Sequence, residues 1–209
     1  MCREADITQR IYERIGTLDM SSLKKVSKGR GVTTREFKNT ITGWYGRELP
    51  WPLVEPDLVL VFEDLKRVVD DTMIVAIEIK YFEQTKDLHK RLRQSFRELG
   101  QPLRNLIFGF DSVVLWHIFS QDVAEQRIQS YVDIVEEVIN RLKLSVVYFA
   151  TTILDGELKI YKPFGIDKYD MQSAVMWLHN LCESKRNPAM DREIEVRRKS
   201  LKVALRIPT

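Results

Sequence analysis

The chain has 209 residues, of which 44% are apolar and 30% charged, and its formal net charge is +3. This length allows one sizeable hydrophobic core, so we expect a single domain over 1–209 with a charged segment at 183–209. The charged fraction is compatible with a thermophilic source, and the small net charge does not by itself indicate a nucleic-acid partner. Only two cysteines are present, which excludes a disulfide framework or a four-thiolate cluster within one chain.

Nothing in the sequence predicts a membrane segment or a secretory signal. The N-terminus is polar without a following apolar stretch, and the longest apolar stretch, 106–119, is interrupted by Asp111 and shorter than a membrane span. We therefore expect a soluble, intracellular protein of the cytoplasm without a membrane partner.

Hydrophobic periodicity predicts the elements of the N-terminal half. A helix is expected at 7–15, then a basic loop with Lys24, Lys25 and Lys28, then a second helix from Thr33 or Thr34 toward Tyr45. Two prolines within 49–52 end that helix. The apolar runs 58–62 and 73–77 predict two neighbouring buried strands, joined by a charged connection.

The C-terminal half alternates between helical and strand patterns. Helical periodicity runs from 86 to 106, although Gly100 and Pro102 are also consistent with one helix ending and another beginning. Further predictions are a strand at 113–119, a helix at 131–142, two strands at 145–154 and 158–161, and a helix at 170–182. Alternation at 201–207 favours a terminal edge strand or a partner contact. Together these elements predict an α/β fold with a mixed sheet and helices on both faces.

Two short motifs carry the chemistry. Pro56-Asp57 opens the first predicted strand, and Glu78-Ile79-Lys80 lies at the end of the second. Because side chains alternate along a strand, Glu78 and Lys80 share one face while Ile79 takes the other. Such a pair of acids with an adjacent lysine can surround a divalent cation and the water that it activates.

This residue set suits phosphodiester hydrolysis. Asp57 and Glu78 would hold Mg²⁺, with Mn²⁺ as a substitute, and a backbone carbonyl such as that of Ile79 would complete the protein ligands. Lys80 would orient or deprotonate the water and stabilise charge at the phosphate. Both motifs also have simpler explanations, because Asp57 suits a turn after proline and Glu78 with Lys80 suits an exposed ion pair.

A cationic stripe follows the second motif at helical spacing. It suits contacts with the phosphate backbone of DNA, although such a stripe is also typical of a solvated helix face. Its members are Lys86, Lys90, Arg93, Arg97 and Arg104.

The segments 55–60, 75–81, 100–105 and 113–116 together resemble the PD-(D/E)XK nuclease superfamily, over roughly 33–119. This resemblance implies a restriction-endonuclease-like fold and places Gln101 on a helix near the metal site. Asn105 stands where a tyrosine is often found in the family. Many members carry a further metal-binding glutamate on the first core helix, for which Glu36 is the first candidate and Glu13 the second.

Members with this core include archaeal Holliday-junction resolvases and restriction-type endonucleases. The resemblance therefore implies a Mg²⁺-dependent DNA nuclease, with an endonuclease favoured over an exonuclease and branched DNA as one candidate substrate. Symmetric cutting of two strands needs two sites, so a two-fold homodimer is the companion expectation. The alternatives are a nucleic-acid-binding protein that keeps the nuclease-like fold without turnover, and a structural or assembly protein.

Overall fold

The computed structural model describes residues 4–29, 55–64, 66, 70–85, 88, 90, 92, 99–154 and 156–207. Seven strands form one sheet whose spatial order is the order of the sequence. They are β1 (Leu23–Lys28), β2 (Leu58–Glu63), β3 (Thr72–Phe82), β4 (Ser112–Phe119), β5 (Val147–Ile153), β6 (Glu157–Lys162) and β7 (Asp167–Asp170). The three central strands β3, β4 and β5 are parallel, and every other neighbouring pair is antiparallel.

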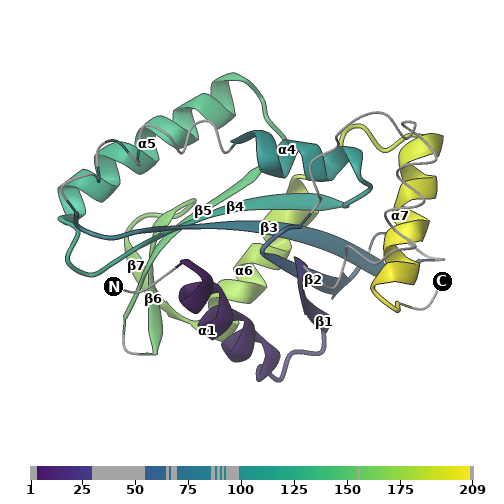
Figure 1. Ribbon diagram of the computed structural model, residues 1–209, viewed down its shortest axis with the longest axis horizontal. Helices are drawn as coiled ribbons and strands as arrows, with labels where there is room; N and C mark the ends of the chain where they lie inside the picture. Colours follow the sequence, from purple (N-terminus) through teal and green to yellow (C-terminus); the bar gives the residue numbers. More distant parts are fainter. Residues whose placement is uncertain are drawn as a thin grey trace.

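Helices cover both faces of this sheet (Figure 1). On one face, α4 (Gly100–Ile107), α5 (Glu125–Arg141) and α7 (Arg192–Ala204) contribute residues to a core with Val113 and Leu115. On the other face, α1 (Glu4–Gly16) and α6 (Met171–Ser184) pack against Trp116 and its neighbours. The predicted α/β class with a mixed sheet and helices on both faces is therefore confirmed.

Most strand and helix predictions agree with the structure. The apolar runs at 58–62 and 73–77 are the neighbouring antiparallel strands β2 and β3, and the pair at 145–154 and 158–161 is the hairpin of β5 and β6. Gly156 in that turn has φ +98, a conformation that favours glycine. A new helix begins at Gly100 with Pro102 in its first turn, which agrees with the second interpretation of that segment. The helix predicted at 33–45 lies outside the described residues.

Two segments were predicted wrongly, and β7 was not predicted. Residues 23–28, expected as a basic loop, form the edge strand β1, whose lysines accompany only two apolar residues. Residues 201–204, for which a terminal edge strand or a partner contact was expected, belong to helix α7, in which Leu201 and Ile194 are buried. The alternation at 201–207 misled because Leu201 and Leu205, four residues apart, also lie on one face of a helix. The basic residues Arg197 and Arg198 of α7 are buried in ion pairs and do not form an exposed basic tail.

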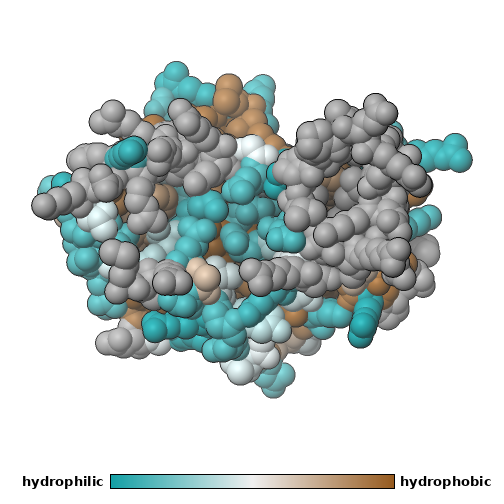
Figure 2. Space-filling model, in the orientation of Figure 1, coloured by the Kyte–Doolittle hydropathy of each residue, from teal (hydrophilic) through white to brown (hydrophobic). Residues whose placement is uncertain are grey.

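None of the described helices combines the length and the apolar character that a membrane crossing requires. On the face seen in Figure 2, hydrophilic residues gather near the centre, over the part of the sheet where Figure 1 labels β3 and β4.

Candidate functional site

The pairing of β2 with β3 brings the two predicted acids together. Leu58 pairs with Ile77 in this antiparallel pair of strands. Asp57, which precedes Leu58, therefore faces Glu78, which follows Ile77. The backbone before β2 lies close to Gly29, the residue after β1, because a Cβ on Gly29 would lie 1.5 Å from the Pro56 carbonyl oxygen. Only glycine allows the two backbones this proximity. The sequence motif is therefore a real spatial pair.

Glu78 is buried, with 2% of its surface exposed. The side-chain amide of Asn105 donates a hydrogen bond of 2.9 Å to Glu78 Oε1. Burial, followed by the negative charge of Asp57, raises the pKa of Glu78 to about 7, although Asn105, Lys80 and Arg104 act in the opposite direction. Two carboxylates held this way repel each other when both are ionised, so a bound cation would stabilise the ionised pair.

Asp57 is half-buried and anchored to β3. Its Oδ2 accepts a hydrogen bond of 2.7 Å from the backbone N–H of Ile79. Burial raises the pKa of Asp57, and the charge of Glu4 adds to this rise, while the Ile79 hydrogen bond and Lys80 lower it. The N–H and C=O groups of one strand residue lie on the same edge of the strand. The Ile79 carbonyl, a predicted ligand, therefore lies on the edge of β3 that faces Asp57.

Lys80 contacts an acid that the sequence analysis did not select. Its Nζ lies 3.5 Å from Glu4 Oε1, and Glu4 Oε2 accepts a hydrogen bond of 3.4 Å from the backbone N–H of Tyr81. Glu4 is the first residue of α1, and a spacing of i, i+3, i+7 and i+11 places it in line with the buried Ile7, Ile11 and Ile15. An acid aligned with an apolar stripe was the signal that could have found it.

The two residues proposed for the extra acid were Glu36 and Glu13. Glu36 lies outside the described residues. Glu13 is exposed and hydrogen-bonded to Gln9, and nine residues of helix separate it from Glu4 by about 13 Å. Glu4 is therefore the acid that α1 places beside Asp57 and Lys80, and a part for Glu13 in the metal site stays a prediction.

Helix α4 supplies two side-chain amides to this region. Gln101 and Asn105 are one helical turn apart on the same face. In the described part of the chain, Gln101 Oε1 and Asn105 Oδ1 are both buried without a hydrogen-bond partner. The sequence analysis selected Gln101 but treated Asn105 only as a departure from a family pattern, whereas Asn105 directly contacts Glu78.

These residues fit a hard divalent cation. Mg²⁺ takes oxygen ligands and keeps several waters, so two carboxylates with unsatisfied amide oxygens nearby are a suitable donor set. The described residues contain no group of three or more acidic, histidine or cysteine side chains close enough to hold a metal without such help. Asp57 and Glu78, with the Ile79 carbonyl, are the residues that would hold Mg²⁺ or Mn²⁺.

The cationic stripe is described only in part. Lys86, Arg93 and Arg97 lie outside the described residues, and Lys90 is exposed. Arg104 is half-buried on α4, and its positive charge lowers the pKa of Glu78, so it lies close to the paired acids. The predicted DNA contact of this stripe stays a prediction.

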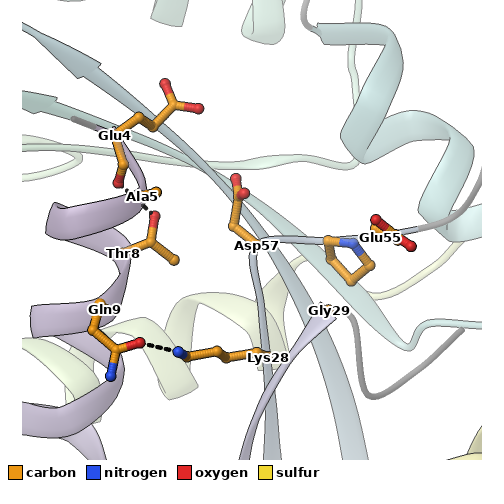
Figure 3. Close-up of a pocket in the computed structure, with 9 residues that line it drawn as sticks. Glu4, Ala5, Thr8, Gln9, Lys28, Gly29, Glu55 and Asp57 are labelled. Atoms are coloured by element: carbon orange, nitrogen blue, oxygen red, sulfur yellow. Dashed lines mark hydrogen bonds between the residues drawn. The ribbon is translucent and has the colours of Figure 1, made fainter.

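A pocket of about 470 Å³ opens beside Asp57 between α1 and the start of β2 (Figure 3). The Glu4 and Asp57 carboxylates lie at one end of this pocket, and the hydrogen-bonded pair Gln9 and Lys28 lies at the other. Thr8 also lines it. Three acids, Glu4, Glu55 and Asp57, outnumber the one cation of the described lining, Lys28, so this pocket is suited to a divalent cation.

Behind Lys80, the sheet carries a neutral histidine. His117 pairs in register with Lys80, and its Nδ1 lies 3.0 Å from the hydroxyl oxygen of Tyr148. Burial, followed by the charge of Lys80, lowers the pKa of His117 to about 3. His117 therefore adds no positive charge beside Lys80 at neutral pH.

No protein-family model matches this chain, and comparison with the curated proteins finds no significant match. The functional argument therefore depends on the residues and their geometry.

Proposed function

We propose that this chain is a Mg²⁺-dependent DNA endonuclease of the PD-(D/E)XK type, with a restriction-endonuclease-like core. One observation carries the proposal: β2 and β3 hold Asp57 against Glu78, with Lys80 on the same face of β3 as Glu78. The raised pKa values of both acids support the proposal, because carboxylates whose pKa is shifted by burial and by a neighbouring charge are common at functional sites.

Each residue has a distinct part in the proposed hydrolysis. A bound Mg²⁺ would acidify a water and neutralise charge on the phosphate. Asp57 and Glu78 would hold it, and Asn105 would keep the Glu78 carboxylate in place. Lys80 would orient the water and donate to a phosphate oxygen, with Glu4 positioning its ammonium group. The water gives up one proton as its oxygen bonds to phosphorus, one P–O ester bond breaks, and the leaving oxygen takes up one proton, so that the proton count is unchanged.

The test is a cleavage assay on duplex, branched and single-stranded DNA, with Mg²⁺, with Mn²⁺ and with EDTA. We expect cleavage only with a divalent metal. Asp57→Asn, Glu78→Gln and Lys80→Met should each lower the rate by at least about a hundredfold, because each removes a metal ligand or a charge at the phosphate.

The matched control variants are Asp19→Asn and Glu137→Gln, which change exposed acids. Both variants should cleave DNA at the rate of the wild type. Equal rates in the wild type and the three site variants would contradict the proposal. Salt-dependent DNA binding without cleavage would instead favour the non-catalytic nucleic-acid-binding protein. The two-fold homodimer stays a prediction, which sedimentation of the protein with and without DNA measures.

A further inference from the structure

A second pocket, of about 440 Å³, lies on the other side of α1 from the pocket beside Asp57. Its lining includes Tyr81, Ile118 and Ile153, which lie at or next to the last residues of β3, β4 and β5. These three strands are parallel, so the pocket lies at their shared carboxyl end. In open α/β sheets this edge is where ligands commonly bind.

The charge of this second pocket is positive. Arg10 and Arg14, one turn apart on α1, both line it, and none of its described lining residues is acidic. The carbonyl oxygen of Gly156 accepts a hydrogen bond of 2.5 Å from Arg14 Nη2, which holds that guanidinium at the pocket. Arg10 is exposed to solvent. The complementary ligand is an anion that a guanidinium can bind, such as a phosphate.

The base of the second pocket is apolar. Ile7, Ile11, Ile118 and Met171 are buried there, and the half-buried ring of Tyr81 lies among its lining residues. A simple inorganic anion would not use this surface. A flat, weakly polar group joined to a phosphate would use both the apolar residues and the arginines, and nucleobases stack readily on aromatic rings.

The second pocket adjoins the candidate active site through the chain itself. Tyr81 follows Lys80, and Glu4 binds both the ammonium of Lys80 and the backbone N–H of Tyr81. A polynucleotide strand that crosses this end of β3 would therefore meet both places in succession.

We propose that the second pocket binds one nucleotide unit, with the phosphate at Arg10 and Arg14 and the base against the half-buried Tyr81 and Ile153. The unit is either a free nucleoside monophosphate or one nucleotide of a bound strand, and the strand reading rests on the proposed nuclease function. Neither reading requires a metal, which allows the pocket to be tested apart from cleavage.

The experiment measures binding to the full chain in EDTA. The probes are thymidine 5′-monophosphate, followed by NMR chemical shifts, and a fluorescent single-stranded oligodeoxythymidylate, followed by anisotropy over a range of salt concentrations. Arg10→Gln should weaken binding about fivefold and lower the salt slope for the oligonucleotide by about 0.7, the value for one lost phosphate contact. Leu154→Glu places a carboxylate at the lining and should weaken binding further.

The matched control is Arg141→Gln, which removes the same charge from an exposed position on α5, across the sheet from α1. Circular dichroism establishes that each variant is folded. If the two pocket variants bind the oligonucleotide more weakly than the wild type, the pocket holds one nucleotide of a strand. If they bind only the monophosphate more weakly, the pocket holds a free nucleotide. The proposal is overturned if neither probe binds at millimolar concentration, or if both variants bind like Arg141→Gln. Absence of cleavage would remove the nuclease function but not this result.

Discussion

At the scale of single residues, the carboxylate of Glu78 is held in a place that disfavours its charge. It is buried, it faces Asp57, and one amide hydrogen bond from Asn105 offsets only part of that cost. Such sites commonly exchange stability for binding or catalysis.

This cost predicts the pH dependence of stability in metal-free protein. The folded protein binds a proton at Glu78 with a pKa of about 7, against 4.5 for the free side chain. The folded state therefore holds the proton more tightly, and this residue lowers stability as pH rises from 4.5 to about 7. At pH 8 in EDTA, Glu78→Gln should raise the free energy of unfolding by up to about 3 kcal/mol.

Chemical denaturation at pH 4 and pH 8 measures the effect, which should disappear at the lower pH. Glu137→Gln is the exposed control and should change stability by less than about 0.5 kcal/mol at either pH. Added Mg²⁺ should stabilise the wild type and not the Glu78→Gln variant. A Glu78→Gln protein less stable than the wild type at pH 8 would show that the carboxylate is a structural group.

Sequence alone could predict Asp57, Glu78 and Lys80 because each belongs to a short motif beside a strong strand pattern. Glu4 and Asn105 reach the same place from α1 and α4, and no local pattern reports which residue of a helix faces a distant strand. Asn105 is separated from Glu78 by 27 positions and contacts it only through tertiary packing. The nearest sequence signal was the alignment of Glu4 with the apolar stripe of α1.

At the scale of elements, α7 is attached to the sheet by a buried charge network. Arg198 is fully buried and donates hydrogen bonds of 2.8 and 3.0 Å to Asp111, with further bonds to Asp70 and to the Thr72 carbonyl. Burial raises the pKa of Asp70, but hydrogen bonds from Arg198, Thr72 and Lys202 lower it well below its usual range. Gly109 permits this packing, because a Cβ there would lie 2.5 Å from the backbone nitrogen of Arg198.

Arg198→Met should therefore destabilise the protein by about 3 to 5 kcal/mol, because it removes the guanidinium that neutralises the buried carboxylate of Asp111. Thermal and chemical denaturation measure the loss. Adding Asp111→Asn should recover part of it, since the amide oxygen can still accept the 2.8 Å hydrogen bond from the Ile74 N–H. Arg141→Met, in an exposed pair, should change stability by less than about 1 kcal/mol. An equally small effect of Arg198→Met would contradict a structural role for the network.

The elements differ in how well the sequence predicts them because they differ in how fully they are buried. Strands β2, β3 and β4 are buried along almost their whole length, so their apolar runs are unmistakable. Strands β1 and β7 are the two edges of the sheet and contain no buried residue, so their patterns are weak. Helix α7 buries two arginines and a lysine, which sequence reasoning assigns to solvent.

At the scale of the whole molecule, two apolar clusters on opposite faces of one sheet account for the buried core. The candidate active site and the second pocket both adjoin the end of β3, on either side of Glu4. Changes that shift α1 should therefore affect both places together, whereas exposed changes in α5 should affect neither.

The order of the strands has a consequence for how the chain folds. Each strand pairs only with its neighbour in sequence, so the sheet can grow by successive local additions. Helix α7 instead depends on contacts between distant positions, because Arg198 reaches Asp111 and Asp70 across 87 and 128 positions. Pulsed hydrogen exchange during refolding should show amides of β3 and β4 protected before those of α7, and simultaneous protection would contradict this order. The helix that comes last in the chain would then also be the last to dock, and it would do so only after the sheet has formed.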